Sequence, residues 1–236
     1  MTDTSLRGVI FDKDGTLYDF QRTWAAFAGT FLSDLAKGDP ALFDLLSHVA
    51  GYDPDARRLL PGSVVIAETP AAIAELLLPF LPQPPALSTL VTDINTAALA
   101  APLCPAVPLA PLLDDLRGRG LALGVATNDA EGPARAHLTS TGVLDRFDFI
   151  AGYDSGHGAK PGPGQLLAFA DAAGLHPSQV LMVGDSAHDL VAGRAAGMAT
   201  VGVLTGVAGS ADLAPLADAV LPNIGGLPAW LDARGR

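Results

Sequence analysis

Residues 8–17 read Gly-Val-Ile-Phe-Asp-Lys-Asp-Gly-Thr-Leu, and this stretch decides the fold class. Its first four residues form an apolar run that is typical of a buried β-strand. Asp12 and Asp14 follow at the point where that strand ends and a glycine-containing turn begins. Residues two apart share a side only while the chain stays extended, so the turn can aim the two carboxylates at one reacting group or metal from different directions. The pattern indicates a catalytic strand end.

The chain after residue 106 alternates between short apolar segments and longer segments with helical spacing. We expect strands at 121–126, 147–152, 180–183, 200–204 and 220–221, and helices at 109–119, 130–141, 163–173 and 188–196. Apolar strands that alternate with helices are typical of a parallel sheet covered by helices on both faces. The predicted fold class is therefore α/β, with a doubly wound parallel sheet.

Residues 20–104 interrupt this alternation. They contain several prolines, no convincing strand, and helical patterns at 24–36, 40–50 and 70–78. We therefore predict two domains, a core made of residues 1–19 and 105–236 and an inserted α-helical domain made of residues 20–104. The prolines of the return segment, 102–111, make it a stiff connection between the two.

The composition excludes several classes of protein. The chain has 236 residues, 49% of them apolar and 17% charged, which suits a folded protein with a sizeable core. The net charge of −11 argues against binding to nucleic acid or to an anionic membrane surface. The single cysteine, Cys104, excludes an intrachain disulfide. The opening residues lack the layout of a signal peptide, and the apolar segment 97–113 is broken by four prolines, so we expect a cytoplasmic protein.

Polar side chains follow four of the expected strands or the loops after them. They are Asp12 and Asp14, then Thr127 and Asn128, then Lys160, and finally Asp185 and Asp189. Because ligands of open parallel sheets bind outside the carboxyl ends of the strands, we expect these side chains to meet at one edge. A lone aspartate there is usually a helix cap, but four such positions in order are hard to explain by capping.

The charges of these residues predict a metal. The four aspartates sum to −4 and Lys160 returns +1. Such a cluster needs a cation, and carboxylate oxygens without histidine or cysteine at the same strand ends favour Mg²⁺ over zinc. Bound Mg²⁺ leaves a net charge of −1, so a phosphate group would need donors such as the Thr127 hydroxyl, turn N–H groups and Lys160. This set of residues fits phosphoryl transfer.

The four motifs resemble those of the haloacid dehalogenase-like hydrolase superfamily, and within it the phosphoglycolate phosphatase-like branch. In family order, the matching stretches are Asp-Lys-Asp-Gly-Thr at 12–16, Thr-Asn at 127–128, Lys-Pro at 160–161 and Gly-Asp-Ser-Ala-His-Asp at 184–189. The resemblance implies a Rossmann-like core with an α-helical cap inserted after the first strand. It also implies a phosphatase that acts on a small phosphorylated metabolite.

The resemblance implies roles for the first-motif aspartates. Asp12 would attack phosphorus and form an aspartyl-phosphate. Asp14 would protonate the leaving oxygen and then deprotonate the water that hydrolyses this intermediate. Mg²⁺ would be bound by the Asp12 carboxylate, the Asp14 backbone carbonyl and Asp185, with Asp189 in support.

The resemblance also assigns the remaining motif residues to substrate binding. Thr127, Asn128 and Lys160 would bind the transferring phosphoryl group, and Lys160 would also restrain the nucleophile. Lys13 stands where many relatives carry an apolar residue, and we predict that it points away from the site as a packing or surface residue.

The sequence leaves several alternatives open. A phosphosugar mutase could use the same core and the same two aspartates, and a non-catalytic protein that binds a phosphorylated ligand could keep the fold. The substrate is open among phosphoglycolate, sugar phosphates and nucleotide monophosphates. The chain is expected to be a monomer or a homodimer.

Overall fold

The computed structural model describes residues 5–60, 63–67, 70–99 and 101–234. The chain divides into two compact units. The core unit comprises Met1–Asp19 and Pro105–Arg236, and the inserted unit comprises Phe20–Cys104.

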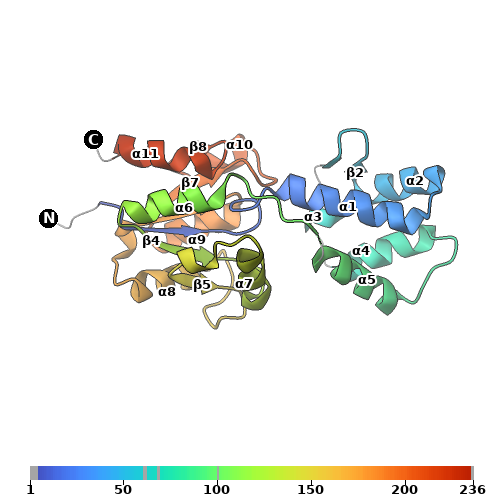
Figure 1. Ribbon diagram of the computed structural model, residues 1–236, viewed down its shortest axis with the longest axis horizontal. Coiled ribbons are helices and arrows are strands. Elements are labelled where there is room, and N and C mark those ends of the chain that lie inside the picture. Colours follow the sequence, from blue (N-terminus) through green and yellow to red (C-terminus); the bar gives the residue numbers. More distant parts are fainter. Residues whose placement is uncertain (1–4, 61–62, 68–69, 100, 235–236) are drawn as a thin grey trace. The chain divides into compact units, whose positions relative to one another are not determined.

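The core unit is built on one sheet of parallel strands (Figure 1). In chain order they are β1 (Gly8–Phe11), β4 (Ala122–Ala126), β5 (Phe149–Ala151), β6 (Val180–Gly184), β7 (Ala199–Val203) and β8 (Ala219–Leu221). Their order across the sheet is β5-β4-β1-β6-β7-β8, with every neighbouring pair parallel. This is the strand order of a Rossmann-like sheet, and it confirms the predicted α/β class.

From β1 the chain adds β4 and then β5 on one side of the sheet, and it then adds β6, β7 and β8 on the other side. This change of direction places β1 and β6 side by side at the centre. Phe11 pairs with Val125 of β4 and with Val183 of β6, so these three strands end level with one another. The Asp12 N–H still donates to the Val183 carbonyl at 2.9 Å. In such sheets this point of reversal is where ligands bind, and it lies beside Asp12.

Helices cover both faces of the sheet. They are α6 (Leu109–Gly118), α7 (Glu131–Ser140), α8 (Gly164–Ala172), α9 (Ala187–Ala195), α10 (Ser210–Leu213) and α11 (Leu227–Arg234), with 3-10 turns at Leu144–Arg146, Pro177–Gln179 and Ile224–Gly226. Crossovers between parallel strands are right-handed. The crossover from β1 to β4, which contains α6, and the crossover from β6 to β7, which contains α9, run in opposite directions across the sheet. The two helices therefore lie on opposite faces. An apolar cluster that includes Ile10, Phe169 and Met182 fills the face under α8 and α9.

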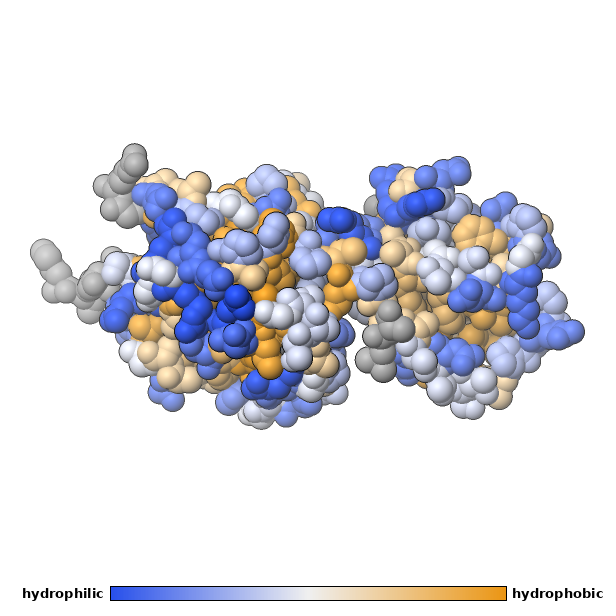
Figure 2. Space-filling model, viewed as in Figure 1, coloured by the Kyte–Doolittle hydropathy of each residue, from blue (hydrophilic) through white to orange (hydrophobic). Residues whose placement is uncertain are grey.

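Most charged side chains of the core unit are paired at its surface. In Figure 2 hydrophilic residues gather over the face that carries α6. There Arg117 pairs with Asp148 at 3.0 Å, and Arg146 pairs with Asp114 at 2.9 Å. Exposed pairs of this kind contribute little to stability, on the order of 0–1 kcal/mol each.

The inserted unit is mainly helical. Its elements are α1 (Phe20–Ala36), α2 (Pro40–Ala50), α3 (Val64–Ala67), α4 (Pro70–Leu77), a 3-10 turn (Leu78–Phe80) and α5 (Leu87–Leu99), with the short strands β2 (Tyr52–Asp53) and β3 (Arg58–Leu59). Asp39 caps the start of α2 by accepting the Ala41 N–H at 2.9 Å, and Gly51 ends it at φ 71°. The unit has its own apolar core, which includes Leu46, Leu77 and Leu90.

The antiparallel pair β2–β3 corrects the expectation that residues 20–104 contain no strand. Strands of two residues show no periodicity, so the sequence carries no signal for them. The Gln21 side chain of α1 stabilises the pair, because its amide accepts the Leu59 N–H at 3.0 Å and donates to the Leu59 carbonyl at 3.2 Å. Helix α5 was not predicted either.

The two connections between the units run beside each other within the core unit. Tyr18 forms an isolated bridge with Pro105, and the Ala106 N–H donates to the Leu17 carbonyl at 2.9 Å. None of the described helices, in either unit, is long and apolar enough to cross a membrane.

Candidate active site

Lys160 connects the ends of β1 and β4 with the first turn of α9 at the carboxyl edge of the sheet. Its ammonium group donates to Asp12 Oδ1 at 2.6 Å, to the Ala126 carbonyl at 2.7 Å and to Asp189 Oδ1 at 2.6 Å. The side chain is almost fully buried, with 2% of its surface exposed. The structure therefore brings together residues from the first, third and fourth motifs around one buried cation.

The loop from β6 to α9 supplies Asp185, and the first turn of α9 supplies Asp189. Ser186 is the N-cap of α9, and Asp189 Oδ2 accepts both the Ser186 N–H at 3.0 Å and its hydroxyl at 2.7 Å. Since the other oxygen of Asp189 accepts Lys160, both of its carboxylate oxygens are engaged. Asp185 accepts the Thr16 hydroxyl at 3.2 Å.

The end of β4 positions Thr127 and Asn128. Thr127 is buried, and its hydroxyl oxygen accepts the Asp129 N–H at 3.1 Å. Asn128 holds the backbone of Lys160 at two points, since its Nδ2 donates to the Lys160 carbonyl and its Oδ1 accepts the Lys160 N–H, both at 2.9 Å. Asn128 thus positions Lys160, and its direct contact with substrate stays a prediction.

Gln165 contributes to the site but carries no signal in the sequence. It is fully buried at the start of α8, and its Nε2 donates to the carbonyls of Thr127 at 3.2 Å and Gly158 at 2.9 Å. Through these bonds it joins the loop after β4 to the loop that carries Lys160. A glutamine within an amphipathic segment is normally a surface residue, so only its tertiary partners distinguish it.

Two acids of this cluster, Asp12 and Asp185, resist ionisation. Burial, together with the charge of Asp189, raises the pKa of Asp12 to about 6, although Lys160 opposes the shift. Burial and the charges of Asp12 and Asp189 hold the pKa of Asp185 well above its usual range. Burial alone would lower the pKa of Lys160, but the two aspartates that it contacts raise it, so Lys160 stays charged.

The cluster fits a divalent metal ion. Asp12, Asp185 and Asp189 each offer a carboxylate oxygen, and these oxygens lie within 4.8 Å of one another. Lys160 offers one positive charge against these three carboxylates, so it does not balance the buried negative charge alone. Hard carboxylate ligands suit Mg²⁺.

Glycines enclose the carboxylate of Asp185. A Cβ built on Gly15 or on Gly206 would collide with the Asp185 side chain, so both backbones approach closer than any other residue allows. Gly15 also has a φ of 88°, which favours glycine. The Asp14 carboxylate lies outside this cluster, so a contribution of Asp14 to a metal would have to come from its backbone carbonyl, as the resemblance implies.

Lys13 is buried, which agrees with a packing residue, but it contacts the site residue Asp14 instead of pointing away from the site. Its side chain is fully buried, and its ammonium group contacts Asp14 Oδ2 at 2.5 Å, His137 Nδ1 at 3.1 Å and Asp129 Oδ2 at 3.4 Å. With Lys13 and its partner Asp129 counted, five aspartates face two ammonium groups, so the net charge before a metal binds is −3. One divalent cation would bring it to −1.

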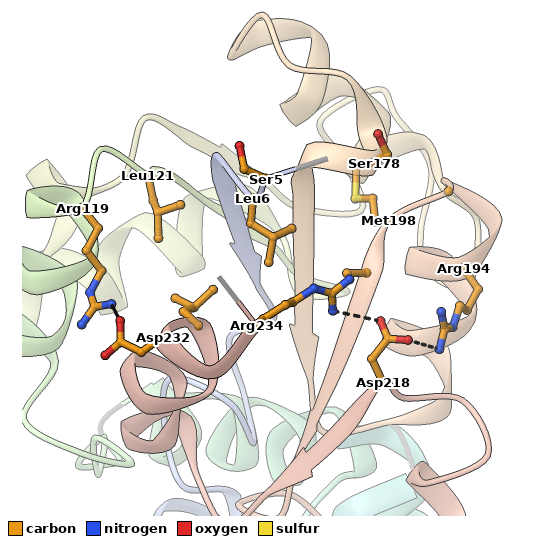
Figure 3. A pocket seen from close by; sticks show the side chains of 13 residues that line it. Ser5, Leu6, Arg119, Leu121, Ser178, Arg194, Met198, Asp218, Asp232 and Arg234 are labelled. Carbon is orange, nitrogen blue, oxygen red and sulfur yellow. Dashed lines mark hydrogen bonds and ion pairs between the residues drawn. The ribbon is translucent and has the colours of Figure 1, made fainter. Parts of the chain in front are cut away.

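A separate hollow lies at the opposite, amino-terminal edge of the sheet (Figure 3). It has a volume of about 680 Å³ and is lined by residues that precede the strands, such as Leu6, Leu121 and Met198. The arginines that border it are paired with aspartates, for example Arg119 with Asp232 at 2.6 Å. The hollow lies far from the acids of the carboxyl edge and shares no residue with them.

Comparison with protein families identifies the chain. The model of the haloacid dehalogenase-like hydrolase family matches residues 6–197, which include all four motifs. A phosphoglycolate phosphatase of Nitrosospira multiformis is 30% identical over 221 residues, which cover 93% of this chain and 92% of that protein. One of Pseudomonas putida is 32% identical over 203 residues, covering 85% of this chain and 70% of that protein. One of Rhodospirillum rubrum is 39% identical over 120 residues, about half of each chain.

Solved structures share the fold. A haloacid dehalogenase family hydrolase from Deinococcus radiodurans, with bound phosphate and sodium, aligns with a TM-score of 0.72 at 22% identity over 99% of this chain and 98% of its own. A phosphatase of that family from Thermococcus onnurineus aligns with a TM-score of 0.59 at 23% identity over 96% of this chain and 98% of its own. The chain belongs to the haloacid dehalogenase-like hydrolase family, in its phosphoglycolate phosphatase-like branch, and is an enzyme of the phosphoric monoester hydrolase class.

Proposed function

We propose that this protein is a Mg²⁺-dependent phosphatase that hydrolyses a small phosphorylated metabolite, such as phosphoglycolate or a sugar phosphate, through an aspartyl-phosphate on Asp12. The observation that carries the proposal is the buried contact of Lys160 with both Asp12 and Asp189, next to Asp185 at the central strand ends. Relatives named phosphoglycolate phosphatase support the substrate class.

The proposed reaction has two displacements. A carboxylate oxygen of Asp12 attacks phosphorus, the bond from phosphorus to the leaving oxygen breaks, and Asp14 gives that oxygen its proton. Asp14 then takes a proton from water, the water oxygen attacks phosphorus, and the bond to Asp12 breaks. Lys160 holds the nucleophile in place, and the buried Thr127 hydroxyl lies at the same edge to bind the phosphoryl group.

Mg²⁺ would be bound by the carboxylates of Asp12 and Asp185 and by the Asp14 carbonyl, with Asp189 supporting through Lys160 and Ser186. When bound, it would neutralise charge on the phosphoryl oxygens. As part of the same proposal, the inserted unit Phe20–Cys104 is a cap that excludes water and selects the substrate.

The test is release of inorganic phosphate from 4-nitrophenyl phosphate and from a panel of metabolite phosphates, with Mg²⁺ or with EDTA. We expect metal-dependent turnover that falls by at least about a thousandfold in Asp12→Asn, because the variant lacks the nucleophile. Turnover that is unchanged by EDTA or by Asp12→Asn would refute the proposal. Conversion of a sugar phosphate to its isomer with a bisphosphate activator would assign a mutase instead.

A further inference from the structure

Lys13 lies between the two aspartates of the first motif and is buried with none of its side chain exposed. Three side chains surround its ammonium group, Asp14 from the same turn, Asp129 from the loop after β4, and His137 from α7. Asp129 and His137 are more than 110 residues from Lys13 in the chain. Lys13 therefore connects Asp14 to the loop after β4 and to α7.

The bond to Lys13 involves one oxygen of the Asp14 carboxylate only. Oδ2 contacts the Lys13 ammonium group at 2.5 Å. Oδ1 is buried and has no hydrogen-bond partner within the described residues. A buried oxygen without a partner is unfavourable, so the carboxylate would turn away from this orientation unless another contact held it. The Lys13 bond is that contact.

Stability alone does not explain a lysine at position 13. Replacing a buried ion pair by apolar side chains of similar size is often neutral or stabilising. The charge at this position thus points to a role in function.

We propose that Lys13 is a positioning residue for Asp14: anchored by Asp129 and His137, it holds Oδ2 and so fixes the orientation of the carboxyl group that exchanges a proton with the leaving group. This inference rests on the proposed function, in which Asp14 is the general acid and base. The side chains that contact the Lys13 ammonium group, Asp14, Asp129 and His137, are distinct from the carboxylates of the metal cluster, Asp12, Asp185 and Asp189.

The first experiment compares leaving groups. We would measure kcat/KM of the wild type, Lys13→Met and Lys13→Arg for 4-nitrophenyl phosphate, phenyl phosphate and a simple alkyl phosphate, because kcat/KM reports the step in which the leaving group departs. Nitrophenolate leaves without a proton, whereas an alkoxide needs one. We expect Lys13→Met to lose about tenfold or more on the alkyl phosphate and about twofold on 4-nitrophenyl phosphate. Lys13→Arg should recover part of the loss.

The second experiment is a double-mutant cycle on phenyl phosphate with Asp14→Asn. If Lys13 acts through Asp14, Lys13→Met costs nothing further once Asp14 has been replaced. A residue that only stabilises the fold would cost the same factor in both backgrounds. Lys37→Met is the control, since Lys37 is an exposed lysine of the inserted unit and its replacement should leave every kcat/KM within about twofold.

A matched pair at His137 keeps the inference testable if Lys13→Met does not fold. His137→Asn keeps an acceptor near the position of Nδ1, whereas His137→Leu removes it and leaves Lys13 in place. We expect the leucine variant, and much less the asparagine variant, to show the same dependence on the leaving group. Equal losses on all three substrates, or additive losses in the cycle, would overturn the inference. Absence of turnover in the wild type with Mg²⁺ would instead refute the proposed function.

Discussion

Lys160 offers the most direct test of the site at the scale of a single residue. We expect Lys160→Met to reduce kcat by about a hundredfold or more, because a preorganised cation next to the reacting group typically contributes that much. The variant also leaves Asp12 and Asp189 buried without their shared partner, so the melting temperature should fall as well. Steady-state kinetics and thermal unfolding measure the two effects. Activity within threefold of the wild type would show that Lys160 has no part in catalysis.

The pKa of Asp12 predicts how stability depends on pH in the absence of metal. Its pKa is about 6 in the folded protein and about 3.9 in an unfolded chain, so folding disfavours the ionised form. The contribution of Asp12 to stability is therefore fully present below about pH 4 and is lost as the pH rises through 6. In EDTA near pH 4, Asp12→Asn and the wild type should have the same melting temperature. At pH 7 the melting temperature of Asp12→Asn should be higher than that of the wild type by roughly 4 °C or more.

Mg²⁺ supplies the control for this comparison. It binds ionised carboxylates, so it should raise the melting temperature of the wild type at pH 7 and do so much less at pH 4 or in Asp12→Asn. A wild type that melts above Asp12→Asn at pH 7 in EDTA would contradict the raised pKa.

At the scale of the element, we expect the loop after β7 to need a glycine at position 206, where its backbone lies against Asp185. A Cβ at Gly206 would collide with the Asp185 carboxylate, so Gly206→Ala should raise the Mg²⁺ concentration needed for half-maximal activity by tenfold or more. Gly209 lies in the same loop, and a Cβ there meets Asp212 only at 3.4 Å, an ordinary contact. Gly209→Ala is thus the matched control. A metal requirement that shifts equally in both variants would show that the close approach of Gly206 is unimportant.

The elements that the sequence predicts well are those with local signals. β1, β4 and β6 were expected within a residue or two of their observed bounds, because each is an apolar run that stops at a polar or glycine residue. The convergence of Asp12, Lys160 and Asp189 follows from parallel strands ending at one edge. These features depend on residues close together in the chain or on a rule that all such sheets obey.

The features that the sequence did not predict depend on partners far away in the chain. Lys13 looked like a packing or surface residue, because nothing near it shows that Asp129 and His137 will surround its ammonium group. Gln165 is distinguished only by the two carbonyls that it joins, and β2–β3 only by the side chain of Gln21. A single sequence carries no local trace of such contacts.

At the scale of the whole molecule, the core unit should fold without the inserted unit. The connections at Leu17–Tyr18 and Pro105–Ala106 are hydrogen-bonded neighbours, so a short glycine-serine linker can replace residues 20–104 with little loop-closure cost. We expect the shortened chain to keep a cooperative thermal transition and the stabilisation by Mg²⁺. It should also lose the discrimination among metabolite phosphates that we expect of the whole protein.

Circular dichroism, calorimetry and the same substrate panel would measure these properties. A shortened chain that is unfolded at 25 °C would show that the core depends on the inserted unit for stability. One that folds and keeps the full substrate preference would refute the role of residues 20–104 in choosing the substrate.

The three hydrogen bonds of Lys160 limit how it could donate to a phosphoryl oxygen. An ammonium group carries three protons, and Lys160 commits one each to Asp12, Ala126 and Asp189. All three N–H groups therefore already donate, and Lys160 can donate to a phosphoryl oxygen only when its bond to one of these acceptors breaks. Under the proposed mechanism, Asp12 loses its negative charge when it becomes an acyl phosphate. The Lys160 proton that restrained the nucleophile would then be free to bind the transferred phosphoryl group.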